Sequence, residues 1–507
     1  MTLPGLSSNS LMQQPTVGPR GDKSVEPLIF EKHVADICAV DFPPLDVPES
    51  ALNSELLGAD INLPSFGQHD VMAHYTHLSD RNFSVDGNFY PLGSCTMKHN
   101  PRINEWAASR PGFASLHPLQ DDDTIQGALR LLYETRVMLE EISGLHEVSL
   151  QPAAGAHGEF TALKVIRAYY VDHGQPGRTV VLAADTAHGT NPASCTMCGA
   201  SVETVRTVDG QTDLNHLKEV ISSIGSDKIA CFMITNPSTA GLFDSNIKEI
   251  SKIIHDAGAM LYLDGANMNA IVGKVKPGEF GADAMHYNTH KTFSTPHGGG
   301  GPGSGPIAVT EALAPYLPVP QVMIANDGSF YLDRDRPKTI GKVRSFIGQF
   351  GVLVRCWTYI SACGPEGLVN IAETAVLNAN YIATCLNDLY SMPYFDSKQK
   401  KFCAHEFVTV PQNLLDKGVT LNDIAKRMID YNIHPPTMHW PVHDCLMVEP
   451  TETESKASLD NFIGVMRKIA AEIEEDIKKV QLAPLESDIS RADEVSAARN
   501  PVVVFTE

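Results

Sequence analysis

The sequence lacks any long apolar run, because no stretch reaches the roughly 20 apolar residues that a membrane-spanning helix needs. Residues 1–27 lack both the apolar centre of an export signal and the arginine-rich pattern of an import signal, so we expect a loose arm on a cytoplasmic protein. Basic residues are few: 39 Lys and Arg against 60 Asp and Glu give a net charge of −21. This charge argues against nucleic acid and anionic membranes as partners.

Cysteine is present, but not in a metal-binding pattern. The ten cysteines are scattered, and Cys195 and Cys198 form a C-x-x-C pair without a second pair at zinc-ligand spacing. We therefore expect no metal site, and thiols that stay reduced. A redox role for the pair stays open, although packing is the simpler interpretation. The chain also shows no internal repeat and no low-complexity tract.

One lysine is followed by a dense run of glycines. Lys291 comes after the apolar strand pattern of residues 282–288, and glycines crowd residues 298–303. Asp264 closes another apolar strand pattern at residues 259–264. An aspartate and a lysine at the ends of successive strands can hold pyridoxal phosphate, because the amine condenses with the cofactor aldehyde and the carboxylate keeps the pyridine nitrogen protonated. Taken singly, these residues also fit a surface lysine, an Asp-Gly turn and a flexible hinge.

A third element upstream favours the cofactor interpretation. Residues 152–159 form a turn of small residues that leads into the helical pattern of residues 160–169. A helix that opens near Gly155 would aim free N–H groups and its positive dipole end at a phosphate. We therefore expect Ala154, Gly155 and Ala156 to bind the cofactor phosphate. The chain order of phosphate loop, aspartate and lysine is the order that this cofactor requires.

Two further strand patterns end in candidate site residues. His188 follows residues 179–184 and could stack on the pyridine ring or cap a local turn; both interpretations stay open. Thr239 follows residues 229–234, and its hydroxyl could reach the phenolic oxygen of the cofactor. The carboxyl ends of parallel strands meet at one rim, where ligands bind. The remaining cofactor-binding candidates are Ala266 and, in a glycine loop whose backbone can approach a phosphate, Gly300 and Gly301.

Long and specific motifs extend over nearly the whole chain, from about residue 28 to residue 502. They lie at residues 89–98, 151–159, 185–194, 236–241, 264, 290–303, 350–355, 364–367 and 446–452. On these segments the chain resembles the glycine decarboxylase P-proteins of the glycine cleavage system. The resemblance is to the lysine-bearing subunit 2 of organisms in which this protein is split in two.

The resemblance implies a fold type I pyridoxal-phosphate enzyme of the aspartate aminotransferase-like α/β class, with the cofactor covalently bound at Lys291. Its mostly parallel sheet would be joined to a smaller C-terminal α/β domain. The implied activity is that of a glycine dehydrogenase (aminomethyl-transferring), which decarboxylates glycine and passes the aminomethyl group to the lipoyl arm of H-protein. Asp264 would support the cofactor ring, while His188 and His290 are candidates for ring packing or proton transfer; His290 could instead only orient Lys291. A separate subunit 1 would complete a two-plus-two assembly.

Other functions on the same scaffold remain open. One alternative is a silent or regulatory subunit, which would be expected to lose Lys291 or Asp264. Another is a different pyridoxal-phosphate-dependent amino-acid lyase, such as a desulfurase, which would need a cysteine on a mobile loop near the substrate. The ligand of the glycine carboxylate stays open: Arg344 and Arg355 are suitable residue types, although an ordinary surface pairing fits either.

At 507 residues the chain exceeds a single core. We expect an N-terminal arm and extended region over residues 1–120 and a large cofactor-binding domain over residues 121–330. A small C-terminal domain should cover residues 331–483, followed by a tail over residues 484–507. Residues 315–337 are rich in Pro and Asp and are expected to cross between the lobes.

Overall fold

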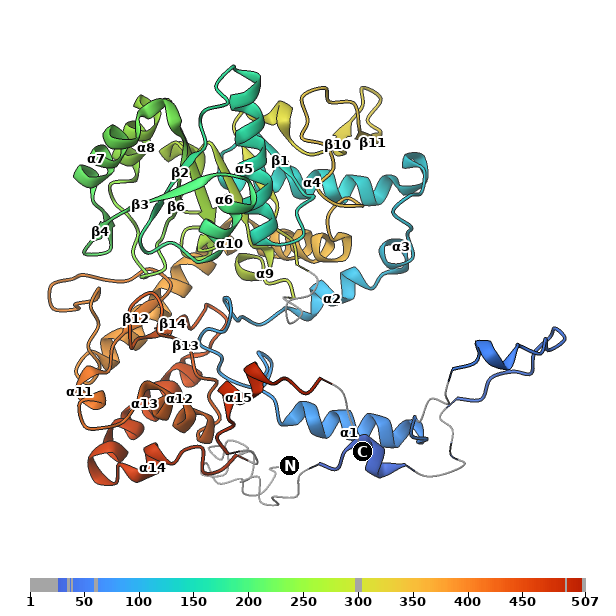
Figure 1. Cartoon of the computed structure of the whole chain (residues 1–507), viewed down its shortest axis with the longest axis vertical. Coiled ribbons are helices and arrows are strands. Elements are labelled where there is room, and N and C mark those ends of the chain that lie inside the picture. The colour runs from blue at the N-terminus through green and yellow to red at the C-terminus, as the bar shows by residue number, and fades with distance from the viewer. Residues whose placement is uncertain are drawn as a thin grey trace, which may run out of the picture.

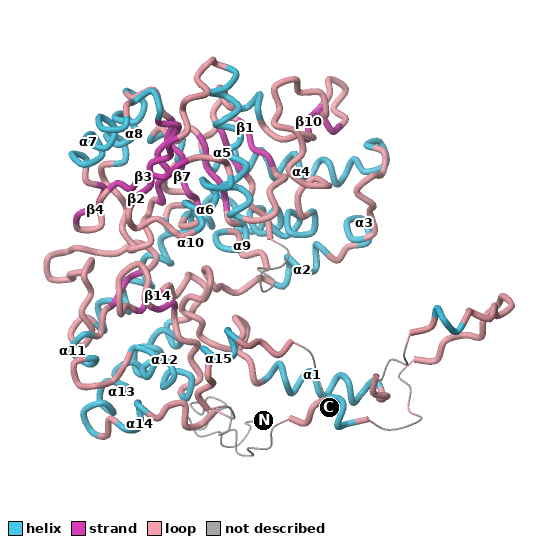
Figure 2. The backbone as a smooth tube through the Cα atoms, viewed as in Figure 1, coloured by secondary structure: helices cyan, strands magenta, loops and turns pink. Residues whose placement is uncertain are grey.

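The computed structural model describes residues 26–33, 37, 40–58, 63–296, 303–487 and 490–503. A larger α/β unit lies above a smaller one in Figure 1, and the N-terminal segment extends to one side of them. Figure 2 shows that most strands gather in the larger unit. Among these described residues, no helix is both long enough and apolar enough to cross a membrane.

Seven strands form the central sheet of the larger unit. They are β1 (Glu147–Ser149), β2 (Val180–Ala184), β3 (Ser201–Val205), β6 (Ile229–Thr235), β7 (Met260–Gly265), β8 (Ala284–Tyr287) and β9 (Ile307–Val309). Their order across the sheet is β1-β9-β8-β7-β6-β2-β3. Neighbours from β8 to β3 pair in parallel, whereas β9 runs antiparallel to both β1 and β8. The mostly parallel sheet predicted from the sequence is therefore present.

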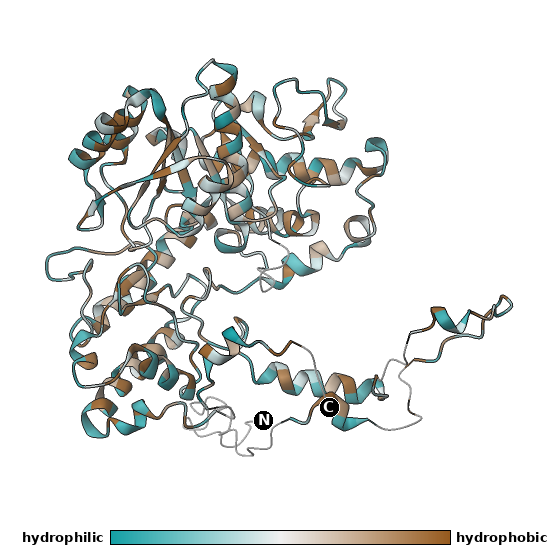
Figure 3. Cartoon of the chain, viewed as in Figure 1, coloured by the Kyte–Doolittle hydropathy of each residue, from teal (hydrophilic) through white to brown (hydrophobic). Residues whose placement is uncertain are grey.

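Both faces of this sheet are buried, because successive side chains of a strand point to opposite sides. In β7, Leu261 and Leu263 belong to one core, whereas Met260 and Tyr262 belong to the other. The central strands are accordingly mostly brown in Figure 3. The first face is covered by α4 (Gln126–Ser143), α7 (Leu214–Ile224), α8 (Ile247–Asp256) and part of α10 (Phe350–Leu386). The second face is covered by α5 (Gly155–Asp172) and α6 (Thr190–Met197).

The smaller unit is a three-stranded antiparallel sheet packed against helices. Its strands are β12 (Phe407–Thr409), β13 (Thr437–Met438) and β14 (Leu446–Val448), in the order β12-β14-β13. Its helices are α11 (Gln412–Leu415), α12 (Leu421–Asp430), α13 (Lys456–Glu475) and α14 (Lys478–Gln481). A capping box starts α12: Thr420 Oγ1 accepts from the Asp423 N–H, and the Asp423 carboxylate accepts from the Thr420 N–H.

The N-terminal segment connects the two units. Phe89 inserts into the core of the smaller unit, while α2 (Arg102–Ala108) packs on α10 of the larger one. Residues 40–58, dark blue in Figure 1, project away from both units with exposed side chains. The remaining elements are α1 (Gln68–Asp80), α3 (Pro111–Ala114), α9 (Thr289–Thr292), α15 (Glu494–Arg499), β4 (Thr207–Val208), β5 (Gln211–Thr212), β10 (Gln321–Ile324) and β11 (Phe330–Asp333).

One expectation about the organisation is wrong. Residues 315–337 do not cross between the units, because β10 and β11 pair as a hairpin on α4. Val322 and Leu332 enter the core of the larger unit, and the Gln126 side chain donates to the Phe330 carbonyl. Burial of apolar side chains stabilises the hairpin, although the stretch is rich in Pro and Asp, which are typical of loops. The domain limits after residues 120, 330 and 483 remain predictions; in the structure, α10 contributes to both cores.

The contact between the units generates a prediction about Gly241. Its backbone lies at φ +77°, and an added Cβ would come within 2.0 Å of the Glu406 carbonyl oxygen. We expect Gly241→Ala to lower the free energy of unfolding by about 2–5 kcal/mol, from left-handed strain plus overpacking. Gly174→Ala is the matched control, because φ is +70° there and nothing lies within 4 Å. If urea titrations showed the same loss in the free energy of unfolding for both variants, the close contact at Gly241 would be contradicted.

Candidate active site

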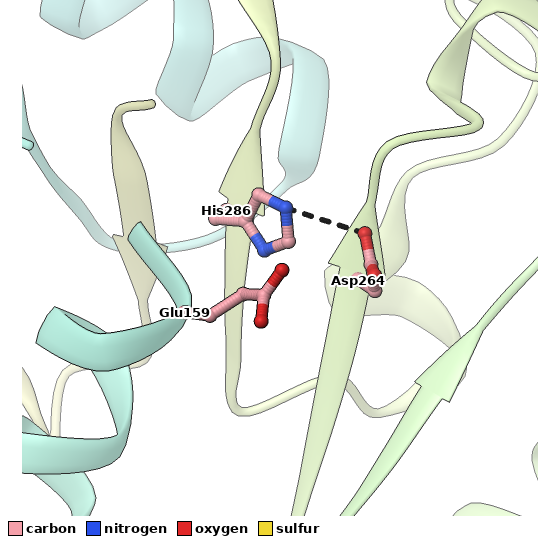
Figure 4. Close-up of side chains that lie close together, drawn as sticks. All are labelled: Glu159, Asp264 and His286. Atoms are coloured by element: carbon pink, nitrogen blue, oxygen red, sulfur yellow. Dashed lines mark ion pairs between the residues drawn. The ribbon is translucent and has the colours of Figure 1, made fainter. Parts of the chain in front are cut away.

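The carboxyl ends of the parallel strands bring together a buried carboxylate, two hydrogen-bond donors and a histidine ring. Asp264, near the end of β7, is 3% exposed. Its carboxylate accepts hydrogen bonds from the Asn191 side chain at 3.0 Å and from the Ala266 N–H at 2.9 Å. The ring Nε2 of His286, on β8, lies 3.2 Å from the same carboxylate (Figure 4). Parallel pairing sets Asp264 beside His286 in the register of β7 and β8.

A hydrogen bond with Tyr262 holds the ring of His286 in place. The Tyr262 hydroxyl lies 2.7 Å from His286 Nδ1, and burial raises the pKa of Tyr262 well above its usual value. Tyr262 therefore stays protonated and hydrogen-bonds His286 Nδ1, while His286 Nε2 faces the Asp264 carboxylate. Burial alone would raise the pKa of Asp264, but the His286 ring, the Asn191 amide, the Ala266 N–H and the charge of Lys291 together lower it. Asp264 is thus held ionised in the protein interior.

A second carboxylate lies on the other side of His286. Glu159, on α5, accepts hydrogen bonds from Thr190 Oγ1 and Ser194 Oγ, each at 2.8 Å. Figure 4 shows Glu159, Asp264 and His286 directed toward one another. Both carboxylates therefore accept hydrogen bonds from α6: Asp264 from Asn191, and Glu159 from Thr190 and Ser194.

The first turn of α5 lies very close to neighbouring residues, and only glycine fits at the two tightest positions. The helix begins at Gly155, and no side chain caps its first N–H groups. A Cβ on Gly155 would come within 1.9 Å of Asn288 Oδ1, and a Cβ on Gly305 within 2.0 Å of the Ala154 carbonyl oxygen. Within the described residues, the buried Ser304 hydroxyl beside this turn has no hydrogen-bond partner. Uncapped N–H groups and a spare hydroxyl fit the phosphate of pyridoxal phosphate.

Lys291 lies on the short helix α9, just beyond β8. Burial raises the pKa of Glu406 and Glu449 in the smaller unit, and the charge of Lys291 opposes this rise; the same charge helps to lower the pKa of Asp264 in the larger unit. No carboxylate in the described part of the chain forms a direct ion pair with its Nζ. The residues of the β7 and β8 ends thus offer an amine and an ionised carboxylate on one rim, as predicted.

A buried lysine supports the helix that carries Lys291. The fully buried side chain of Lys98 forms an ion pair with Glu452 at 2.7 Å. Its Nζ also donates to Asn269 Oδ1 at 3.0 Å and to the Thr292 carbonyl at 2.9 Å. Lys98 therefore ties the N-terminal segment, the larger unit and the smaller unit together next to Lys291.

Two family models cover most of the chain. Residues 46–331 match the glycine cleavage system P-protein, and residues 371–493 match the C-terminal domain of glycine dehydrogenase. The "probable glycine dehydrogenase (decarboxylating) subunit 2" of Bacillus licheniformis is 50% identical over 94% of this chain and 98% of its own length. The protein of the same name from Halalkalibacterium halodurans is 51% identical over the same shares of the two chains. This chain belongs to the glycine cleavage system P-protein family.

Solved structures agree on the fold of this P-protein family member. An inhibitor-bound glycine decarboxylase (P-protein) superposes with a TM-score of 0.66 at 21% identity, covering 82% of this chain and 93% of that one. An apo cysteine desulfurase from Thermococcus onnurineus gives 0.58 at 17% identity, over 78% and 98% of the two chains. Together with the sheet order, these likenesses confirm the predicted fold type I.

The other predicted site residues differ in their burial and in their contacts. Ala266 contacts Asp264 through its N–H, and Thr239 is buried in the loop after β6. His188 is exposed before α6, with its ring Nδ1 2.8 Å from Thr190 Oγ1, and His290 is partly exposed beside Lys291. Gly300 and Gly301 lie outside the described residues. The roles assigned to His188, His290, Thr239 and the two glycines therefore remain predictions.

Sequence reasoning missed four groups that contact this site: His286, Asn191, Glu159 and Lys98. Asn191, Glu159 and Lys98 lie inside the motifs that carried the family resemblance, which was their only signal. His286 had none, because its contact depends on the register of β7 and β8.

The structure shows the surroundings of Arg355 and of the Cys195–Cys198 pair, whose roles the sequence left open. Nε and Nη2 of Arg355 each donate to an oxygen of the Glu105 carboxylate at 2.7 Å. This bidentate contact fits the interpretation of Arg355 as a member of an ordinary surface ion pair. Burial raises the pKa of Cys195 to about 12 and that of Cys198 to about 11. Both thiols are therefore protonated at neutral pH and unsuited to nucleophilic chemistry, which favours packing.

Removal of the Lys98 ammonium should destabilise the protein strongly. We expect Lys98→Met to lower the free energy of unfolding by about 3–5 kcal/mol, because the Glu452 carboxylate would stay buried without its cation. The double variant Lys98→Met/Glu452→Gln should recover part of this loss in urea titrations. Lys456→Met is the control, because its pair with Asp460 is exposed and its loss should leave the midpoint unchanged. A loss no larger than that of the control would contradict a structural role for Lys98.

Proposed function

We propose that this chain decarboxylates glycine with pyridoxal phosphate and transfers the aminomethyl group to the lipoyl arm of H-protein. The observation that carries the proposal is the placement of an ionised, donor-held Asp264 and of Lys291 at the ends of neighbouring strands. The relatives named glycine dehydrogenase (decarboxylating) subunit 2 support the substrate and the reaction.

Each part of the site has a task in this function. When bound, pyridoxal phosphate supplies an aldehyde for covalent attachment and a ring that accepts electrons from the substrate α-carbon. Lys291 provides the amine for attachment, and Asp264 keeps a proton on the ring nitrogen. His286 and Asn191 hold the Asp264 carboxylate in place. The N–H groups at Gly155 bind the phosphate.

The remaining candidates have supporting roles in the proposal. Ala154, Ala156, Gly300 and Gly301 present backbone N–H groups to the phosphate. His188 packs on the ring, Thr239 donates its hydroxyl to the phenolic oxygen, and Ala266 holds Asp264 through its N–H. His290, directly before Lys291, orients the lysine or moves a proton near it.

A partner subunit belongs to the proposal as well. The relatives are named as subunit 2, which implies a subunit 1, and we propose a two-plus-two assembly that receives lipoylated H-protein. The projecting segment 40–58 supports an interface, since it exposes Phe42, Leu45, Leu52 and Leu56 by 66–87%. The nine cysteines in the described residues are all free, which fits a reducing compartment such as the cytoplasm.

The alternative functions lack a supporting observation. A silent subunit would be expected to lose the lysine or the aspartate, yet this chain keeps both Asp264 and Lys291 at the ends of neighbouring strands. A desulfurase needs a reactive cysteine, whereas burial raises the pKa of Cys195, Cys198 and Cys445 above the thiol's usual value. Decarboxylation of glycine is therefore the function that the site supports best.

The lysine assignment predicts a spectroscopic result. Wild-type protein supplied with pyridoxal phosphate should show a visible absorbance band that shifts when glycine is added, and Lys291→Ala should not. Borohydride reduction should fix the cofactor on the peptide that contains Lys291, as read by mass spectrometry. Lys274→Ala is the control, since that lysine forms an exposed ion pair with Glu373. A colourless wild type would instead favour the silent subunit.

The aspartate assignment predicts a loss of rate without a loss of attachment. Asp264→Asn should still bind the cofactor at Lys291, because the amide keeps the size of the side chain. Release of labelled CO2 from glycine, with H-protein and subunit 1 present, should fall about 10²–10³-fold because the charge opposite the ring is gone. Release at the wild-type rate would refute the role of Asp264.

A further inference from the structure

Three side chains of the types that bind metal ions meet in the core of the smaller unit. Glu406 directly precedes β12, and Glu449 directly follows β14. The strands pair antiparallel with Phe407 opposite Val448, so the next step of the ladder sets the two glutamates opposite each other. His405, the neighbour of Glu406, is 0% exposed, and each glutamate is 1% exposed. These three residues, the His405 cluster, are therefore shielded from water.

The distances within the His405 cluster fit a shared cation. Nε2 of His405 lies 3.7 Å from Glu449 Oε1 and 3.9 Å from Glu406 Oε1. One ligand atom from each of the three residues lies within 4.8 Å of the other two. Bonds from Zn²⁺ to nitrogen and oxygen are about 2.0–2.2 Å long, so two ligand atoms on one cation lie roughly 3–4 Å apart. The two histidine distances have this spacing, and both are too long for a hydrogen bond.

His405 has no partner that accounts for its burial. Within the described residues, neither of its ring nitrogens has a hydrogen-bond partner. A buried polar atom without a partner costs free energy, so such atoms are rare in native proteins. Burial lowers the pKa of His405 to about 3, so the ring is neutral and keeps the lone pair that binds metal ions. A cation beside Nε2 would supply the missing partner.

A second cluster of the same residue types shows what a satisfied arrangement looks like. Glu159, Asp264 and His286 also have ligand atoms within 4.8 Å of one another. There the histidine Nδ1 is hydrogen-bonded to Tyr262 at 2.7 Å, and both carboxylates accept from side chains of α6. That cluster belongs to the site of the proposed function. The His405 cluster differs from it because the histidine has no partner.

The two carboxylates of the His405 cluster have few hydrogen-bond donors. Thr96 Oγ1 lies 2.9 and 2.7 Å from the two oxygens of Glu449. Asn267 Nδ2 donates to Glu406 Oε1 at 3.1 Å. An ionised carboxylate has about four lone-pair sites, so much of the capacity of both groups is unused. A cation can use these sites without displacing Thr96 or Asn267.

The nearby charges leave the two glutamates without a cation in direct contact. Lys98 forms its ion pair with Glu452 at 2.7 Å. Burial raises the pKa of both Glu406 and Glu449, and the charge of Lys291 only opposes this rise. Two ionised carboxylates at this spacing repel each other unless they hold a proton or share a cation. Their two negative charges match the charge of one divalent cation.

We propose that Nε2 of His405 and one oxygen each of Glu406 and Glu449 bind a divalent cation such as Mn²⁺ or Zn²⁺. One imidazole and two carboxylates suit such cations. Any proton on the glutamates leaves to solvent as the cation binds, and nothing is oxidised or reduced. The cysteine spacing predicted no metal site, but none of these ligands is a cysteine. The cation site does not rest on the proposed function.

The place of the cluster gives the cation a structural effect. Asn267 donates both to the Pro237 carbonyl of the larger unit at 3.0 Å and to Glu406 of the smaller unit. A cation held by Glu406 and Glu449 joins the ends of β12 and β14 beside this bridge. Mn²⁺ should therefore raise the urea midpoint of the wild type, because it binds the folded chain and not the unfolded one. An unchanged midpoint at saturating Mn²⁺ overturns the proposal.

Electron paramagnetic resonance with Mn²⁺ tests the ligands on the full chain without added cofactor. Pulsed spectra of the wild type should show one bound Mn²⁺ coupled to a histidine nitrogen. His405→Gln should lose this coupling and at least about 100-fold in Mn²⁺ affinity, because loss of even an outer partner of a metal ligand costs about 10–100-fold. His443→Gln is the control, since that exposed ring pairs with Asp444 at the surface. Absence of the coupling in the wild type, or an unchanged affinity in His405→Gln, overturns the proposal.

Infrared spectroscopy distinguishes a shared cation from a shared proton. At pH 6, below the pKa of about 7 of Glu449, saturating Mn²⁺ should remove the protonated-carboxyl band that Glu449→Gln lacks. A band that persists overturns the proposal, because the glutamates then hold a proton in place of a cation. Should His405→Gln fail to fold, Glu449→Gln replaces it in the affinity measurement, and an unchanged affinity overturns the proposal. Attachment of pyridoxal phosphate at Lys291 is measured separately, so the proposed function stands or fails on its own.

Discussion

The structure depends on keeping one carboxylate ionised in a buried place. Asp264 would become protonated by burial alone, since desolvation is the largest single influence on its pKa. It stays charged because β8 sets His286 beside it, α6 supplies Asn191, and the turn after β7 supplies the Ala266 N–H. The sheet register, the start of α6 and the turn at Ala266 each support this one charge.

In the smaller unit, the balance between burial and hydrogen bonding shifts the pKa of two buried glutamates in the opposite direction. Glu406 and Glu449 are as buried as Asp264, but each has a single neutral side-chain donor and each faces the other. Burial therefore wins, and their pKa values rise where that of Asp264 falls. That contrast comes from the number and type of donors and not from the depth of burial.

Much of the larger unit was predictable because its signals are local. The apolar runs that end at Asp264 and before Lys291 predicted β7 and β8 nearly to the residue, and small residues near Gly155 predicted the start of α5. Contacts that depend on long-range pairing were not predictable. Lys98 meets Glu452 across 354 positions, and Glu406 meets Glu449 only through the ladder of β12 and β14. No periodicity within either segment encodes such a meeting.

The site is therefore built across both units, and their relative position has chemical meaning. A Cβ at Gly241 would strike the Glu406 carbonyl, and Asn267 would lose its bridge if the smaller unit moved away. Such a movement would also take Glu406 away from Asn267 while leaving Asp264 in the larger unit untouched. The groups that keep Asp264 ionised belong to the larger unit, whereas Glu406 and Glu449 belong to the smaller one. A variant that loosens the contact at Gly241 should thus alter the environment of Glu406 before it alters the environment of Asp264.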